Sequence, residues 1–275
     1  MTLLKVENLS VYSPSGELLV DEINFSLDKG SRIGLVGESG SGKTLTGLSI
    51  LGLLPPSLRA TGSVQIKDQS ERWIDVLTTS ESALNQIRGS LVTAVFQDPL
   101  PSLDPLMKVG RQLALPISRH QGIRGKEVSA AVEEALLSVK ISQPGRVARS
   151  FPFEISGGER QRVAIAMALA CDPSLLIADE PTTSLDVQVQ AEVLDLLDEI
   201  VEKRNMSLVF ISHDLAVVSK IVGEVLVLQK GRTVENGSVG SLLSNPINPY
   251  SRELVASARR LDALLDSSFE FGDER

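Results

Sequence analysis

The stretch Gly37-Glu-Ser-Gly-Ser-Gly-Lys43-Thr44 decides the fold of this chain. It fits the phosphate-loop pattern G-x-x-x-x-G-K-[ST] without a mismatch. Residues 32–36 before it are typical of a short buried strand, and residues 43–54 after it predict an apolar helix that ends at Pro55-Pro56. The alternative, a glycine-rich turn without a ligand, explains neither Lys43-Thr44 nor the flanking elements. The sequence therefore predicts a strand, a phosphate loop and a helix in succession.

Each residue of this loop is a candidate nucleotide ligand. Glycines let backbone N–H groups curl around a β-phosphate, and the N-terminus of the following helix adds a favourable dipole. Lys43 would reach the β- and γ-phosphate oxygens, and the Thr44 hydroxyl would bind Mg²⁺. The predicted nucleotide-binding residues are Gly37, Glu38, Ser39, Gly40, Ser41, Gly42, Lys43, Thr44 and the residue at position 45.

The regions around the loop indicate an α/β protein with two additions. Residues 3–10 and 18–27 alternate apolar and polar side chains, which predicts antiparallel strands, and residues 62–76 and 91–96 are also rich in strand formers. From Ser156 onwards helix and strand patterns alternate, which predicts parallel strands with a ligand at their carboxyl ends. The expected elements are helices at 157–171, 186–203 and 214–222 and strands at 174–179, 207–211 and 223–229.

The predicted fold class is thus a P-loop NTPase core, a mainly parallel sheet with helices, plus an antiparallel β subdomain and an inserted helical subdomain. Residues 1–97 would form the first part of the nucleotide-binding core with the antiparallel strands. Helical periodicity across residues 98–155 predicts the helical subdomain, and residues 156–240 would complete the core. Residues 241–275 form a C-terminal tail, and its acidic last part, 261–275, is expected to be frayed.

Acidic residues follow the apolar strand pattern at 175–178. Asp179 would organise Mg²⁺ directly or through water, and Glu180 would polarise the water that attacks a γ-phosphate. The alternative is a solvated acidic turn before Pro181, and the phosphate loop upstream favours the catalytic interpretation. His213 ends the next strand, where it would contact the γ-phosphate or hold Glu180 and the water in place.

Ser156-Gly-Gly-Glu-Arg-Gln161 opens a predicted helix. Ser156 is a good N-cap, and the two glycines leave helix N–H groups approachable by an anion. A capped helix start is common, so the order of the motifs gives this one its weight: it follows the phosphate loop and precedes Asp179.

Composition bounds the possible functions. The net charge of −8 argues against a protein that neutralises nucleic-acid phosphates over a broad basic face. The apolar runs fall short of the roughly 18–20 residues that span a bilayer, so other chains would have to cross any membrane. Residues 1–5 run directly into a strand pattern, so no targeting signal is expected. The single cysteine, Cys171, excludes an intramolecular disulfide and is interpreted as a small buried hydrophobe in a reducing compartment.

In their order, these motifs resemble those of ATP-binding cassette (ABC) ATPases, over about residues 3–240. The resemblance implies that Gln97 is the Q-loop glutamine, a ligand of Mg²⁺ and water that also senses the transmembrane partner. It also implies that Ser184-Leu185-Asp186 is the D-loop and that Tyr12 stacks on adenine, although Tyr12 could instead pack against the sheet. The expected catalytic residues are Glu180, His213, Gln97 and Lys43, and the expected cofactors are ATP and Mg²⁺. Glu159 departs from the family pattern, which usually has glutamine there.

The segments 96–107 and 245–251 look like those of the oligopeptide, dipeptide and nickel importer subfamily. That likeness implies a peripheral protein on the cytoplasmic face of the cell membrane. Its partners would be a second ATPase subunit, identical or paralogous, two transmembrane permease subunits and, indirectly, a solute-binding protein outside the cell, with no nucleic acid. Two alternatives stay open: a soluble ABC ATPase acting on nucleic acid or ribosomes, and an unrelated P-loop kinase, which would not need the motif at 156–161.

Overall fold

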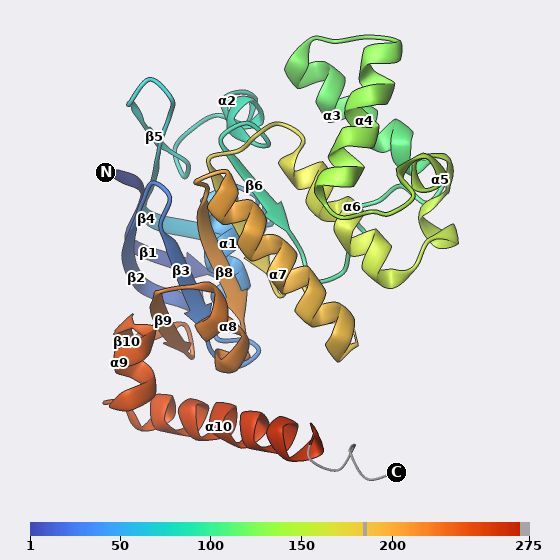
Figure 1. Cartoon of the computed structure of the whole chain (residues 1–275). Coiled ribbons are helices and arrows are strands. Elements are labelled where there is room, and N and C mark those ends of the chain that lie inside the picture. The colour runs from blue at the N-terminus through green and yellow to red at the C-terminus, as the bar shows by residue number, and fades with distance from the viewer. Residues whose placement is uncertain (184–185, 270–275) are drawn as a thin grey trace. The chain divides into compact units, whose positions relative to one another are not determined.

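The structure is a computed structural model that describes residues 1–183 and 186–269 (Figure 1). Its residues form two compact units, Met1–Thr78 with Val209–Arg275, and Thr79–Leu208. Strand β8 (Ser207–Ser212) begins in the second unit and ends in the first. The functional division expected from the sequence, with boundaries after residues 97, 155 and 240, stays a prediction.

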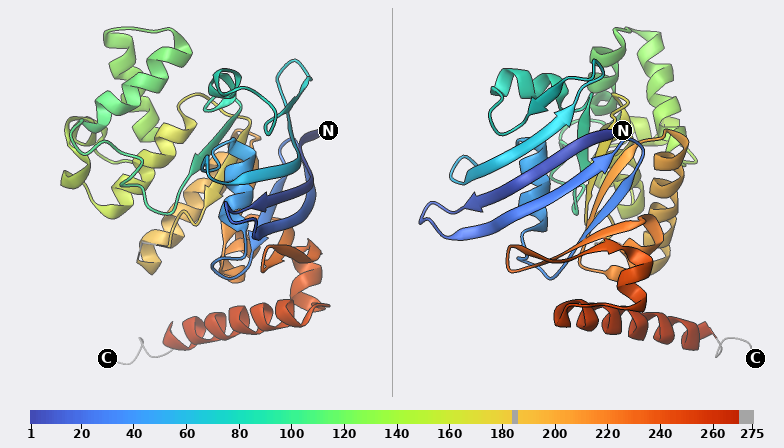
Figure 2. Two further views of the ribbon diagram at one scale, coloured as in Figure 1. Left: turned by 180° about the vertical axis from the view of Figure 1, so that it is seen from behind. Right: turned by 90° about the vertical axis from the view of Figure 1, so that its left-hand side faces the viewer.

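An antiparallel sheet forms part of the first unit, as the alternating pattern predicted. Its strands lie in the order β2-β1-β4-β5, and the long hairpin of β1 and β2 is drawn in blue in Figure 2. Alternation places side chains such as Leu4, Val6 and Ile66 on a fully buried face. The strands are β1 (Thr2–Tyr12), β2 (Leu18–Asp28), β4 (Arg59–Lys67) and β5 (Trp73–Asp75).

The other strands of the first unit lie in the order β10-β9-β3-β8. The phosphate loop follows β3 (Arg32–Val36), which pairs in parallel with β9 (Glu224–Gln229). Strand β10 (Arg232–Ser238), which the sequence pattern did not predict, runs antiparallel to β9. Strands β8 and β9 are almost continuously apolar and buried, as strands covered on both faces require.

The described residues of the first unit form four helices: α1 (Lys43–Leu51), α8 (Leu215–Ile221), α9 (Val239–Ser244) and α10 (Pro249–Phe269). Helix α1 ends three residues earlier than predicted, because Gly52 adopts a φ of 64° and its N–H caps the last turn. Helix α10 contacts α8, α9 and β10 and extends to Phe269. The fraying expected from residue 261 stays a prediction. Residues 270–275 lie outside the described residues.

The second unit holds the helical segment expected at 98–155 together with two parallel strands. Helices α3 and α4, with the shorter α5, pack beside α6 (Figure 1). Their shared interior includes the fully buried Leu113, Leu136 and Val147. The elements are α2 (Glu81–Ile87), β6 (Val92–Val95), α3 (Val109–Gln121), α4 (Lys126–Ser138), α5 (Pro144–Arg149), a 3₁₀ turn (Pro152–Glu154), α6 (Gly157–Leu169), β7 (Leu175–Asp179) and α7 (Val187–Lys203).

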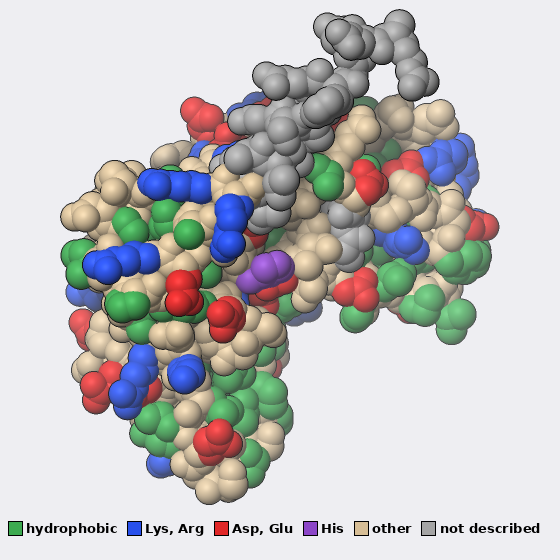
Figure 3. All heavy atoms as spheres, turned by 90° about the horizontal axis from the view of Figure 1, so that it is seen from below, with side chains coloured by type: hydrophobic (Ala, Val, Ile, Leu, Met, Phe, Trp, Pro, Cys, Tyr) green, Lys and Arg blue, Asp and Glu red, His purple; other side chains and the backbone are tan. Residues whose placement is uncertain are grey.

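Two surface properties bear on function. On the face drawn in Figure 3, basic and acidic side chains of the described residues are interspersed with apolar ones. None of the described helices combines the length and the apolarity that spanning a bilayer requires.

Cys171 is half-buried rather than fully buried as expected. Its partial burial raises the pKa of the thiol, which keeps it protonated and weakly nucleophilic.

Two neighbouring leucines of α4 test the packing of the second unit. Leu136 has 0% of its surface exposed, whereas Leu137 is 57% exposed. We expect Leu136→Ala to lower the free energy of unfolding by about 2–5 kcal/mol, because it removes buried methyl groups and leaves a cavity. Leu137→Ala should change it by less than about 0.5 kcal/mol. Urea titrations of both variants measure the difference, and equal losses would contradict the packing described here.

Candidate functional site

The phosphate loop lies between β3 and α1, and its shape depends on glycine. Gly40 and Gly42 have φ angles of 79° and 98°, a region that residues with side chains rarely adopt. Gly37 passes so close to β9 that a Cβ atom there would lie 2.1 Å from the carbonyl oxygen of Leu228. A Cβ at Gly40 would meet nothing within 4 Å, so the loop is open on that side. The glycines thus produce a curled loop whose backbone a ligand can approach.

Lys43 lies inside this curl. It is 5% exposed, and its Nζ donates hydrogen bonds to the carbonyl oxygens of Gly37, at 2.7 Å, and Glu38, at 2.8 Å. The loop therefore holds a buried positive charge among backbone groups, which fits the binding of a phosphate chain. Thr44, the next residue of α1, is exposed and able to present its hydroxyl to a cation.

Position 45, also expected to bind nucleotide, is a half-buried leucine and offers only its backbone. Thr46 is fully buried instead, and its hydroxyl donates to the Gly42 carbonyl oxygen at 2.9 Å. Thr46 therefore supports the loop from within the helix, and Leu45 has no polar side chain to offer a ligand.

Residues near the C-terminus hold the loop from outside, which the sequence analysis missed. Gly231, in the turn between β9 and β10, donates its N–H to the Ser41 carbonyl oxygen at 3.2 Å. The Tyr250 hydroxyl accepts a hydrogen bond from the Glu38 N–H at 2.8 Å. The sequence analysis used residues 245–251 only as a mark of the importer subfamily, but the hydroxyl of Tyr250 contacts the phosphate loop directly.

Two more predicted residues lie in the first unit. Tyr12 ends β1, and the Arg59 guanidinium carbon lies 4.8 Å from its ring centroid, a cation–π contact. Stacking of Tyr12 on adenine stays a prediction. His213 directly follows β8 and is exposed. Asp214 beside it caps α8 by accepting from the Ala216 N–H at 2.8 Å, which fixes the turn that presents the histidine.

In the second unit, β6 and β7 bring three predicted residues to one sheet edge. The strands are parallel, and Val95 is aligned with Ala178. Gln97 comes two residues after Val95, and Asp179 and Glu180 come directly after Ala178, so all three lie at the carboxyl ends of paired strands. Asp179 is 8% exposed, and Gln97 is exposed.

Glu180 has an unusual backbone conformation. Its φ is 48°, in the left-handed region that a glutamate seldom adopts, and such strain is concentrated at functional sites. Its Oε2 accepts a hydrogen bond from the Thr183 hydroxyl at 3.0 Å. The turn after β7 thus fixes the direction of this carboxylate, a feature that the run of acids in the sequence did not reveal.

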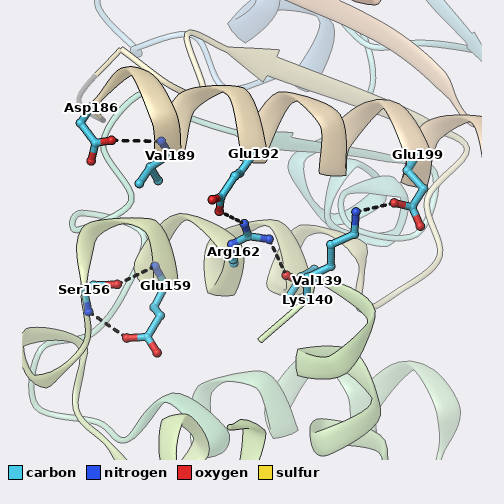
Figure 4. Close-up of polar contacts among 9 residues, drawn as sticks. All are labelled: Val139, Lys140, Ser156, Glu159, Arg162, Asp186, Val189, Glu192 and Glu199. Carbon is cyan, nitrogen blue, oxygen red and sulfur yellow. Dashed lines mark hydrogen bonds and ion pairs between the residues drawn. The ribbon is translucent and has the colours of Figure 1, made fainter. Parts of the chain in front are cut away.

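The signature motif begins α6 with a complete capping box (Figure 4). The Ser156 hydroxyl accepts from the Glu159 N–H at 3.2 Å, and the Glu159 carboxylate accepts from the Ser156 N–H at 3.0 Å. Glu159 also forms an ion pair with Arg146 of α5. The unusual glutamate of this motif is therefore both a capping group and a charge-paired one.

A surface hollow of about 380 Å³ borders this helix start. Arg162 lies on it and links three elements: it donates to the Val139 carbonyl oxygen at the end of α4 and to Glu192 of α7 (Figure 4). Asp186 caps α7 by accepting from the Val189 N–H at 3.0 Å. Of the predicted D-loop, Ser184 and Leu185 lie outside the described residues.

The donor set fits Mg²⁺ only as a partner of bound phosphate. Among residues 1–183 and 186–269, no group of three or more His, Cys, Asp or Glu side chains is arranged to hold a metal ion. Mg²⁺ usually takes one or two protein oxygens together with substrate phosphates and water. Each unit offers an oxygen donor of that kind: the exposed Thr44 hydroxyl in the first and the Asp179 carboxylate in the second.

Comparison with known proteins adds to this geometry. The family model described as ABC transporter matches residues 20–183, more than half of the chain. The chain belongs to the ABC transporter family. It is 45% identical to the peptidoglycan transport ATP-binding protein YejF of Agrobacterium fabrum, over 93% of this chain and 47% of that protein. It is 40% identical to the oligopeptide transport ATP-binding protein AppD of Bacillus subtilis, over 96% of this chain and 81% of that protein.

A solved structure supports the fold assignment. An ATP-binding cassette in a dimeric, post-hydrolysis state bound to ADP and Pi is 27% identical, with a TM-score of 0.73 over 86% of this chain and 99% of that one. The predicted fold class, a P-loop core with an antiparallel β part and helices, is confirmed. The chain spans about half the length of YejF and about four-fifths of AppD.

The contribution of the buried Lys43 ammonium to nucleotide binding can be tested by a single substitution. We expect Lys43→Ala to abolish tight Mg-ATP binding, because it removes the positive charge that the loop holds for the phosphates. Lys29→Ala, which removes an exposed lysine of the same unit, is the control and should bind as the wild type does. Titration of each purified protein with a fluorescent ATP analogue measures the affinity, and an unchanged Lys43→Ala would refute the role of the loop.

Proposed function

We propose that this chain is the ATP-hydrolysing subunit of an importer, and that it couples Mg-ATP binding and hydrolysis to the transport of peptides through separate membrane subunits. The main support is the curled phosphate loop around Lys43 in a chain of the ABC transporter family. AppD is named for oligopeptide transport and YejF for peptidoglycan transport, which favours cargo with a peptide component over nickel.

Each predicted residue has a role in the proposed hydrolysis. Lys43 neutralises charge on the β- and γ-phosphates, and the loop N–H groups orient them. Glu180 accepts a proton from water as the water oxygen attacks the γ-phosphorus and the bond to the β-γ bridging oxygen breaks. His213 and Gln97 position the water and the γ-phosphate. Mg²⁺, held by Thr44 and Asp179, would neutralise developing negative charge on the phosphates.

We propose further that the active form is a dimer in which the signature of one subunit completes the ATP site of the other. Ser156 and the first N–H groups of α6 would close over the γ-phosphate bound by Lys43 of the partner. The dimeric cassette with ADP and Pi is a relative in which two cassettes associate with nucleotide present. ATP would then join the subunits and hydrolysis would release them, a population shift that can drive membrane partners between two states.

The proposed partners follow from the same likeness. Two permease subunits would span the membrane, the chain would bind them at the cytoplasmic face with Gln97 and the loop after it, and a solute-binding protein would deliver cargo from outside. The alternative, an ABC ATPase acting on nucleic acid or ribosomes, is less well supported, because the relatives compared are named for transport.

Replacement of the proposed base tests the ATPase and transport together. We expect Glu180→Gln to lower ATP turnover by about 10²–10⁴-fold while ATP binding survives, because a general base is lost and the phosphate contacts stay. Peptide uptake by cells carrying only this variant should fall with turnover. Glu199→Gln, an exposed carboxylate of α7, is the matched control. Loss of turnover with normal uptake would refute coupling to peptide import, and normal turnover would place the base elsewhere.

Assembly is tested by mass in solution. In the Glu180→Gln background, Mg-ATP should increase the dimer fraction, with the chain alone or mixed with its paralogous partner. Ser156→Arg should abolish that increase, because a long side chain would fill the helix start where the phosphate is expected. Ser129→Arg, on the exposed surface of α4, is the control. Light scattering with and without Mg-ATP measures the dimer fraction. A dimer fraction that does not change with ATP, or that Ser156→Arg does not reduce, would show that the signature completes no site in the partner.

A further inference from the structure

We propose that Tyr250 is a positioning residue of the phosphate loop, and that residues 246–250 set the affinity of the loop for nucleotide through its hydroxyl. This inference rests on the proposed binding of ATP by the loop and gives a role to a residue to which the family resemblance assigned none.

One loop residue connects Tyr250 with Lys43. The Glu38 N–H donates to the Tyr250 hydroxyl at 2.8 Å, and the Glu38 carbonyl oxygen accepts from Lys43 Nζ at 2.8 Å. Tyr250 thus fixes the loop from outside at the residue whose other backbone group holds the ammonium. A change in the tyrosine contact should therefore alter where Lys43 is presented to phosphate.

Tyr250 is itself held in place by hydrogen bonds from backbone N–H groups to the side chains of Glu235 and Asn248. Glu235 of β10 accepts from the N–H groups of Ile247 and Asn248, both at 2.9 Å. Asn248 Oδ1 in turn accepts from the Tyr250 N–H at 2.9 Å. Burial alone would raise the pKa of Glu235, but the Ile247 and Asn248 N–H groups, together with Ser251 and the positive charge of Arg252, outweigh burial and lower that pKa, so the carboxylate stays charged.

The hydroxyl of Tyr250 has a role in hydrogen bonding that is separate from the packing of its ring. Tyr250 is 5% exposed, so a phenylalanine would bury the same ring. Within the part of the chain that the structure describes, only the hydroxyl oxygen of Tyr250 accepts from the Glu38 N–H. Burial also raises the pKa of Tyr250, which keeps the hydroxyl neutral and brings no negative charge to a loop that binds anions.

The test compares Tyr250→Phe with two other variants. Tyr250→Phe should weaken ATP affinity about three- to tenfold, the effect of losing one neutral hydrogen bond, and leave kcat at saturating ATP within about twofold. Asn248→Ala should shift affinity in the same direction, because it frees the Tyr250 N–H. Arg259→Ala is the control: it removes a hydrogen bond from α10 to the Leu243 carbonyl oxygen, away from the loop, and should bind ATP normally.

Amide hydrogen exchange of the nucleotide-free proteins supplies a readout that does not depend on ATP. In Tyr250→Phe, exchange should accelerate in peptides that contain Glu38 and stay unchanged elsewhere. Unchanged affinity and exchange would overturn the proposal, as would an equal loss of affinity in Arg259→Ala or acceleration throughout the chain. If the wild type failed to bind ATP, the proposed function would fail, while the exchange of Glu38 would still report whether Tyr250 holds the loop.

Discussion

The hydrogen bonds from the Lys43 ammonium to the carbonyl oxygens of Gly37 and Glu38 are the interaction on which the rest of the site depends. A buried ammonium without partners is strongly unfavourable, so the loop must keep those carbonyls turned inward. Glycine at positions 40 and 42 permits the necessary curl. The surrounding elements of the first unit then prevent the loop from opening: β9 contacts it at Gly37, the turn after β9 binds Ser41, and Tyr250 binds Glu38.

In the second unit, the predicted site residues are placed instead by the common edge of two parallel strands. Because β6 and β7 are in register, a glutamine after one and two acids after the other arrive at the same edge without any contact between their side chains being needed to place them. The left-handed φ of Glu180 and its hydrogen bond from Thr183 then direct one carboxylate. The register of β6 and β7 therefore sets the position of these residues, and the turn after β7 sets the direction of the Glu180 carboxylate.

The sequence predicted the core well where period and motif agree. The phosphate loop, the strand before it and the alternation of helices and strands after Ser156 all depend on local patterns, and the structure has them within a few residues. The prediction from sequence failed where contacts between residues distant in the chain determine the structure. Residues 246–250 carry proline and asparagine, which indicate a loop. No local sequence pattern shows that Glu235 accepts hydrogen bonds from that loop, or that the Tyr250 hydroxyl contacts Glu38. Likewise, no pattern around Asp179-Glu180 predicts a positive φ.

The glutamate in the signature is the departure from the family pattern that most needs a physical account. A negative charge at the start of α6 is favourable for the helix dipole but would repel a phosphate at the same place. The structure reduces that conflict in two ways. One oxygen of Glu159 accepts the Ser156 N–H, and the other faces Arg146, so the charge is directed away from solvent and compensated by a guanidinium. The pair is partly exposed and adds little stability by itself. Its consequence is electrostatic: the Glu159–Arg146 pair carries no net charge, so the guanidinium offsets the repulsion between the glutamate and an approaching anion.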